Sequence, residues 1–238
     1  MKLVSVVLLL APLLTSCQNL GQPVDCSEIH QHDNTQSSGV YTIYPAGEWS
    51  AVQVYCDMDS LRGGWTVFQR RMDGSVNFYR PWDQYKVGFG SAAGEYWLGL
   101  DNIHYLTNHQ HYELLVDMED FEGAKVWARY TSFSVGAECD GYVLNVSGFI
   151  DGGAGDSLKH HNGKKFSTLD KDQDIWPNHC ARTFLGAFWY GNCLHANPNG
   201  VYRWGADNAV HAVGVEWKHW KGHDYSLKTI SMKIRPVQ

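Results

Sequence analysis

The sequence predicts an α+β domain in which antiparallel strands dominate. Four β-branched and aromatic runs lie between turn residues: WTVFQRRM at 65–72, YELLVDMEDF at 112–121, AKVWARYTSFSV at 124–135 and YVLNVSGFI at 142–150. Runs of this composition are typical of strands. Only the segments 82–85 and 97–106 are expected to form short helices. Ten tryptophans, thirteen tyrosines and twenty-four glycines in a chain that is 18% charged predict an aromatic core with turn-rich connections.

The N-terminus indicates export from the cell. Lys2 precedes LVSVVLLLAPLL, an apolar run too short to span a bilayer, and small residues follow at 15–17. We therefore expect a secretory signal peptide at 1–17, a short leader at 18–23 and one domain at 24–238. The mature protein is expected in the extracellular space or matrix, with no membrane span.

The cysteines are expected to be oxidised in that compartment. If Cys17 leaves with the signal peptide, Cys26 with Cys56 and Cys180 with Cys193 are the favoured local pairs. Cys139 is then single, which suits either an interchain disulfide or a buried free thiol.

The sequence also predicts one modification site and excludes one class of partner. Asn145, followed by Val146 and Ser147, is an N-glycosylation acceptor. The net charge of −6 and the scattered basic residues argue against nucleic acid as a partner.

Three alternating acids, Asp170, Asp172 and Asp174, offer oxygen atoms along one edge of a loop, which is the chemistry that calcium prefers. An EF-hand is excluded, because neither register places glycine at loop position six or glutamate at position twelve. The alternative is a solvated turn without metal.

Three patterns that resemble catalytic motifs are better explained without catalysis. The block 155–158 spells the nucleophile motif of one esterase family, near His160 and His161, but its glycines predict an irregular turn. The histidines lack zinc-site spacing, and the acids at 117–120 are too close in sequence to act as a glycosidase pair. We expect no enzymatic activity.

The sequence resembles the fibrinogen-related domains of fibrinogen, ficolins and tachylectins over residues 24–236. The matching motifs are VDC at 24–26, VYCDM at 54–58, GGWTV at 63–67, GEYWLGL at 94–100, FST at 166–168, NPNG at 197–200, YSL at 225–227 and MKIR at 232–235. The resemblance implies a single globular domain with a twisted antiparallel sheet, short helices and a loop-rich subdomain for calcium and ligand.

The resemblance also implies particular site residues. Calcium would be held by the side chains of Asp172 and Asp174 and by the carbonyls of Trp176 and Asn178, with waters completing the shell. Asp170 would then be a turn or supporting residue.

Many members of the family bind acetyl groups beside that loop, at a cis peptide that would here join Asn192 and Cys193. This sequence departs from the acetyl-binding pattern. Leu194 replaces a histidine, and Phe184, His211 and His223 stand where tyrosines are frequent. His195 either enters the pocket or is a surface histidine. We expect the histidines at 211 and 223 to make ligand binding sensitive to pH.

We therefore expect a secreted, calcium-binding recognition protein. The first hypothesis is an adhesion protein of the matrix that binds elastin, fibrillin or collagen and forms homo-oligomers linked through Cys139. The alternative is a lectin of innate immunity that binds acetylated glycans on microbes. No Arg-Gly-Asp triplet occurs in the sequence, so integrin binding through that triplet is not expected.

Overall fold

The computed structural model describes residues 21–206 and 209–237, so the predicted signal peptide lies outside the described residues. Its centre is an antiparallel sheet of nine strands. These strands are β1 (Gly39–Ile43), β2 (Val52–Asp57), β3 (Trp65–Arg71), β4 (Phe89–Gly90), β5 (Tyr96–Trp97), β6 (Tyr112–Glu119), β7 (Lys125–Val135), β8 (Leu144–Gly152) and β13 (Thr229–Pro236). The four runs predicted as strands are thus confirmed, as β3, β6, β7 and β8.

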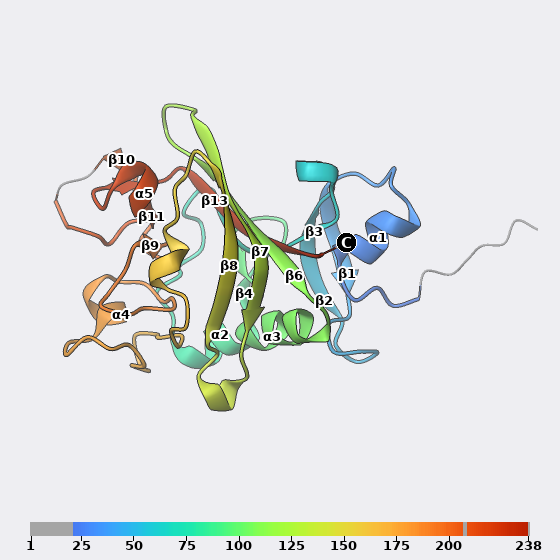
Figure 1. Ribbon diagram of the computed structural model, residues 1–238, viewed down its shortest axis with the longest axis horizontal. Coiled ribbons are helices and arrows are strands. Elements are labelled where there is room, and N and C mark those ends of the chain that lie inside the picture. The colour runs from blue at the N-terminus through green and yellow to red at the C-terminus, as the bar shows by residue number, and fades with distance from the viewer. Residues whose placement is uncertain (1–20, 207–208, 238) are drawn as a thin grey trace, which may run out of the picture.

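The sheet joins segments that are distant in sequence. Its main order is β1-β2-β3-β13-β6-β7-β8, with β5 paired to β3 and β4 paired to β5. The last strand, β13, therefore lies between β3 and β6 (Figure 1). Ile230 of β13 is paired with Arg71 of β3 and with Met118 of β6. Pairing in the middle of the sheet thus depends on residues 229–236, which are far in sequence from both neighbouring strands.

Three helices accompany the sheet: α1 (Cys26–His32), α2 (Trp82–Val87) and α3 (Leu100–His109). α1 begins where the Asp25 carboxylate accepts the amides of Ser27 and Glu28, a favourable N-cap. α3 packs against β7 and α2 and buries its apolar stripe. The predicted helix at 97–106 starts three residues late, because Trp97 is paired with Gln69 as part of β5.

The segment between β8 and β13 is loop-rich (Figure 1, left). Its regular elements are short: α4 (Cys180–Thr183), α5 (Lys218–Lys221), and the pairs β9 (Ala196–Asn197) with β11 (Glu216–Trp217) and β10 (Gly205–Ala206) with β12 (Tyr225–Ser226). Of the three 3-10 turns among the described residues, only Leu158–His160 lies in this segment, because Ser60–Arg62 precedes β3 and Glu138–Asp140 connects β7 to β8. The loop-rich segment therefore has few inter-strand backbone hydrogen bonds that could fix the positions of its side chains.

An aromatic cluster joins this loop-rich segment to the rest of the domain. The ring of Phe166 is fully buried and lies 5.6 Å from Trp97 of the sheet and 5.1 Å from Trp189 of the loops, between ring centroids. It also contacts Tyr85 of α2 at 5.3 Å. Such aromatic pairs bury large apolar areas and have restricted geometry, so the cluster fixes one segment against the other.

The structure contains both predicted disulfides, Cys26 to Cys56 and Cys180 to Cys193. Cys139 is an exposed free cysteine, so the alternative of a buried thiol is wrong. Asn145 is exposed on β8, an edge strand. None of the helices in the described part of the protein is long and apolar enough to cross a bilayer.

We predict that Phe166→Ala will destabilise the domain by about 3–5 kcal/mol, because it removes a buried ring and leaves a cavity between four aromatic neighbours. Urea unfolding followed by tryptophan fluorescence measures this. The matched control is Phe121→Ala, since Phe121 is exposed, and it should cost less than about 1 kcal/mol. Equal losses in the two variants would show that the cluster does not join the segments.

Candidate functional site

The acidic loop is tied to the helical part of the domain through its first aspartate. Asp170 Oδ1 accepts the amide of Trp82 at 2.9 Å and the hydroxyl of Thr168 at 2.7 Å. Trp82 is the first residue of α2, whose own N-cap, Pro81, provides no capping side chain. Asp170 therefore supplies a cap from a distant part of the sequence, which agrees with the supporting role that the resemblance implied.

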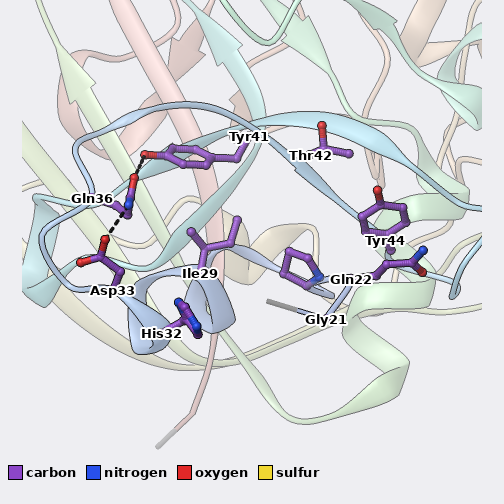
Figure 2. A pocket seen from close by; sticks show the side chains of 10 residues that line it. Gly21, Gln22, Ile29, His32, Asp33, Gln36, Tyr41, Thr42 and Tyr44 are labelled. Carbon is purple, nitrogen blue, oxygen red and sulfur yellow. Dashed lines mark hydrogen bonds between the residues drawn. The ribbon is translucent and has the colours of Figure 1, made fainter. Parts of the chain in front are cut away.

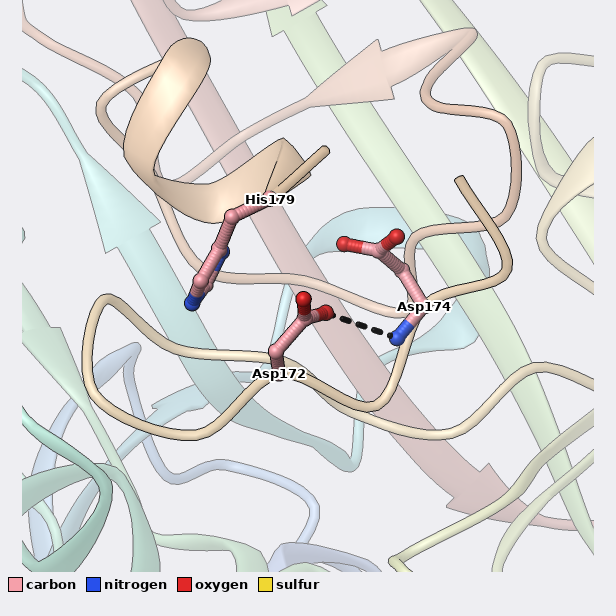
Figure 3. Close-up of side chains that lie close together, drawn as sticks. All are labelled: Asp172, Asp174 and His179. Atoms are coloured by element: carbon pink, nitrogen blue, oxygen red, sulfur yellow. Dashed lines mark hydrogen bonds between the residues drawn. The ribbon is translucent and has the colours of Figure 1, made fainter. Parts of the chain in front are cut away.

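The second and third aspartates face one another in the same loop. Asp174 accepts the amide of Trp176 at Oδ1 and the amide of Cys180 at Oδ2, both at 2.9 Å. Asp172 accepts the amide of Asp174 at 3.2 Å (Figure 3). One ligand atom from each carboxylate and one from His179 lie within 4.8 Å of one another. The loop thus brings together the two acids predicted to hold a metal.

The electrostatics of this pair favour a bound cation. Burial raises the pKa of Asp174, and although two amides lower it, the neighbouring Asp172 charge raises it again. A divalent cation between the carboxylates would relieve both the desolvation and the repulsion. The carbonyls of Trp176 and Asn178 accept no hydrogen bond from the described residues, so they are available as further oxygen ligands.

His179 is a neighbour of this site that the sequence pattern did not indicate. Its Nδ1 accepts the amide of Arg182 at 3.4 Å, while its buried Nε2 has no hydrogen-bond partner among the described residues. A neutral imidazole that accepts at Nδ1 carries its proton on Nε2. The ring therefore offers a donor to a carboxylate or a bound water, whereas the predicted ligands at 172, 174, 176 and 178 would all offer oxygen, as calcium prefers.

The surface beside the loop contains several features predicted for the acetyl pocket. The peptide between Asn192 and Cys193 is cis, and Cys193 is bonded to Cys180 at the start of α4. Phe184 follows α4 directly and lies 6.2 Å from the ring of Trp176. An aromatic pair thus stands next to the acidic loop.

Two other residues predicted for the pocket, Leu194 and His195, make contacts with the rest of the protein. Leu194 is only 6% exposed and belongs to the hydrophobic core. His195 stacks on His160 with ring centroids 4.3 Å apart, and its Nε2 lies 2.9 Å from Nζ of Lys218. Burial, with the neighbouring His160 and Lys218 charges, lowers the pKa of His195 to about 4. His195 is therefore a neutral acceptor near pH 7.

His211 and His223 form a second cluster with two acids. Their rings are 5.3 Å apart, and His211 pairs with Asp224 at 2.8 Å while His223 pairs with Glu216 at 2.9 Å. Burial raises the pKa of Glu216, and the His223 contact opposes this rise. The pH dependence expected from these histidines remains a prediction.

Two buried polar residues that were not predicted as site residues connect the segments of this region. Asn197, the first of them, donates to the carbonyls of Phe184 and Ala212 and accepts the hydroxyl of Tyr190 at 2.6 Å. It therefore links the segment after α4 to the segment before β11. Its location in the NPNG motif was visible, but its partners depend on the tertiary fold.

His161 plays the same role for the residues after the second disulfide cysteine. Its Nδ1 donates to the carbonyl of Trp189 at 2.7 Å, and its Nε2 accepts the amides of His195 and Ala196 at 3.1 and 3.0 Å. A protonated ring could not accept those two amides. Burial lowers the pKa of His161 to about 3, so the side chain is neutral at physiological pH.

The serine of the esterase-like block has no access to substrate. Ser157 is fully buried, and its Oγ lies 3.0 Å from Nδ1 of His219 while also accepting the His219 amide. The adjacent Asp156 accepts the hydroxyl of Tyr130 at 2.7 Å. These contacts stabilise a turn, as the glycine-rich sequence predicted.

A cavity of about 460 Å³ occurs at the other end of the molecule, between α1 and β1 (Figure 2). Ile29, Tyr41 and Tyr44 form its apolar part. Gln36 at its edge is hydrogen-bonded to Asp33 and Tyr41. None of the residues predicted for calcium or ligand binding lines this cavity.

Comparison with known sequences confirms the resemblance predicted from the motifs. A family model described as the C-terminal globular domain of fibrinogen beta and gamma chains matches residues 22–237. Human microfibril-associated glycoprotein 4 is 54% identical over 91% of this sequence and 86% of its own length. Human fibrinogen C domain-containing protein 1 is 53% identical over 85% of this sequence, which corresponds to 45% of that protein.

Solved structures confirm the predicted fold. The fibrinogen-like globe domain of human ANGPTL6 matches with a TM-score of 0.88 and 42% identity, covering 92% of this protein and 98% of that one. Lamprey fibrin D-dimer, solved in complex with the peptide ligand Gly-His-Arg-Pro-amide, matches with a TM-score of 0.83 and 32% identity. That match covers 94% of this protein and 79% of the lamprey polypeptide.

We predict that His161 makes the domain less stable as the pH falls. Its pKa is about 3 in the folded state and near 6.5 when unfolded, so the unfolded state binds more protons between these values. The contribution of neutral His161 to the free energy of unfolding is complete above pH 6.5. It falls on acidification by up to about 1.4 kcal/mol per pH unit. Urea midpoints between pH 7.5 and 5 measure it.

His161→Gln provides the comparison, because glutamine does not titrate in this range. The variant will be less stable at every pH, but the slope of its stability against pH should be smaller. An unchanged slope would contradict the role assigned to His161. His32→Gln, which changes an exposed histidine, should keep the original slope.

Proposed function

Because this protein belongs to the family of C-terminal globular domains of fibrinogen beta and gamma chains, we propose that it is a secreted recognition and adhesion glycoprotein of the extracellular matrix. The observation that carries the proposal is the 54% identity with human microfibril-associated glycoprotein 4 over most of both proteins. Elastin, fibrillin and collagen are the proposed partners. The protein acts by binding and is not an enzyme.

Calcium is the proposed cofactor. The facing carboxylates of Asp172 and Asp174 and the available carbonyls of Trp176 and Asn178 support it. A bound cation would neutralise the two acids and hold the loop against Cys180, whose amide already bonds to Asp174. The ligand surface next to this loop would then be ordered by calcium binding.

The buried Leu194 supports the matrix role over the lectin role. The acetyl-binding pattern has a histidine at position 194, whereas this protein has a leucine whose side chain is buried in the core. The cis peptide and the aromatic pair of Trp176 and Phe184 support the alternative, a lectin that binds acetylated glycans. The binding experiment below separates the two.

Oligomers and a glycan complete the proposal. Cys139 is exposed in the 3-10 turn Glu138–Asp140, where it is accessible to a second copy of the protein. Several weak sites in one oligomer would bind a repetitive matrix polymer far more tightly than one site. Asn145 on the exposed edge of β8 is the proposed N-glycosylation site.

We predict that calcium at about 100 times its dissociation constant will stabilise the protein by about 2.7 kcal/mol, because it binds only the folded loop. Asp172→Asn and Asp174→Asn should each abolish most of this stabilisation, measured as the calcium-dependent shift in thermal unfolding. Asp170→Asn is the matched control, because its remaining carbonyl oxygen can still accept the Trp82 amide. Equal loss in all three variants would contradict the ligand assignment.

We predict that the secreted protein will bind immobilised tropoelastin in the presence of calcium and will be released by a chelator. The second surface is an N-acetylated resin, eluted with chelator or with free acetate. Capture by the resin and not by tropoelastin would favour the lectin role. Failure to bind tropoelastin, fibrillin or collagen with calcium present would refute the matrix proposal.

A further inference from the structure

A second cavity, of about 340 Å³, lies beside β3 and shares no residue with the candidate calcium or acetyl sites. We refer to it as the Arg71 cavity. One wall is the segment 74–79 after β3, and the opposite wall contains Leu185 and residues 200–202. Its volume suits a ligand of roughly one or two amino-acid residues, toward the lower end of the range for small-molecule sites.

A buried cation lines this cavity. Arg71 is 1% exposed, and its Nη1 donates to the carbonyls of Pro198 and Gly200 at 3.1 and 2.7 Å. Its Nε has no hydrogen-bond partner among the described residues. The guanidinium also lies 4.1 Å from the ring centroid of Phe78. Arginine remains charged when buried, so an unmet donor here is costly unless a ligand accepts from it.

The nearest acid, Glu95, forms a buried ion pair with Arg71 but does not accept a hydrogen bond from Nε. Glu95 Oε1 is 3.6 Å from Arg71 Nε, which is too long for a hydrogen bond. Both oxygens of Glu95 are already engaged: Oε1 accepts the amides of Met72, Asp73 and Gly74, and Oε2 accepts the amide of Val76. Glu95 therefore shares its negative charge between Arg71 and four backbone amides, so the ion pair compensates the positive charge of Arg71 only in part.

The rim of the cavity is apolar and includes a strained residue. Leu185 has φ of 49° directly after the C-cap of α4, a position where glycine is usual because a side chain is unfavourable there. The leucine is nevertheless 37% exposed at the cavity rim. Such backbone strain in a residue other than glycine clusters at ligand-binding and active sites, which directs attention to this rim.

The same rim continues into exposed aromatic surface. Tyr202 lines the cavity and lies 6.0 Å from the ring of Trp204, which is 75% exposed. Exposed tryptophan and tyrosine with aliphatic neighbours are enriched where proteins bind partners. The cavity thus combines a cationic interior with an apolar entrance.

We propose that the Arg71 cavity binds a carboxylate attached to an apolar group, with the carboxylate at Arg71 and the apolar group against Leu185 and Tyr202. A partner polypeptide can present this chemistry as its C-terminal carboxylate or as an acidic side chain beside an apolar residue. The proposal goes beyond the function proposed above, and it requires neither calcium nor the cis peptide.

The test uses the full secreted protein labelled with ¹⁵N-arginine and titrated with 3-phenylpropionate, in the presence of a calcium chelator. Saturable binding in the millimolar range should shift the Nε–H resonance of Arg71, as expected for a ligand of this size. The neutral 3-phenylpropionamide should bind at least about tenfold more weakly, because it lacks the charge-assisted hydrogen bond. Equal binding of acid and amide, or no shift of Arg71, would overturn the proposal.

Two variants test the cavity without removing Arg71. Leu185→Gly should leave the thermal midpoint nearly unchanged, because it relieves the positive φ, yet weaken 3-phenylpropionate binding several-fold. Ser75→Glu places a competing carboxylate in the lining and should abolish binding, whereas Ser75→Gln, of the same size, should retain most of it. Undiminished binding in Ser75→Glu would place the ligand elsewhere and refute the proposal.

Two pairs of short peptides distinguish the sources of the carboxylate. One pair ends in phenylalanine, with a free carboxylate or an amide, and the other is amidated with an internal Asp-Phe or Asn-Phe. Tighter binding of the free-carboxylate or Asp-Phe member identifies the source, and no preference in either pair argues against the cavity as a peptide site. Because these titrations contain chelator, their outcome is independent of tropoelastin binding.

Discussion

Packing of the Phe166 ring against Trp97, Tyr85 and Trp189 is the interaction on which the arrangement of the domain depends. The sheet has continuous ladders that define its geometry, but the loop-rich segment between β8 and β13 does not. Phe166 lies at the start of the acidic loop, so its burial fixes that end of the loop relative to the sheet. Apolar burial, which has no preferred direction, thereby positions the carboxylates of the acidic loop, whose hydrogen bonds and metal contacts require a defined geometry.

Within the loop-rich segment, side chains replace the missing backbone ladders. Asn197, His161 and Asp174 each bind two or more backbone groups, and Glu95 binds four amides near the Arg71 cavity. Each such group is buried or partly buried, where an unpaired donor or acceptor is costly. The irregular backbone is therefore specified by polar side chains, and the same contacts position both proposed binding surfaces.

Local sequence patterns correctly predicted four of the main strands and both disulfides. The four strand runs, both disulfides and the family motifs were visible because composition, turn residues and cysteine spacing reveal them. The structure extends the site beyond those patterns. The donor role of His179, the links made by Asn197 and the unmet Nε of Arg71 depend on the tertiary fold. The start of α3 at Leu100 was mispredicted for the same reason, because a distant strand recruits Trp97.

The central position of β13 has a consequence for how the protein is made. β3 and β6 emerge from the ribosome long before residues 229–236, which pair with both of them. During synthesis these two strands present unpaired edges to the compartment in which they fold, and such edges attract other polypeptides. Closure of the sheet therefore requires that β13 has been synthesised, and it joins strands that are far apart in sequence, which slows folding. A polypeptide truncated before Thr229 would keep the edges of β3 and β6 unpaired and would be recognised by chaperones and degraded.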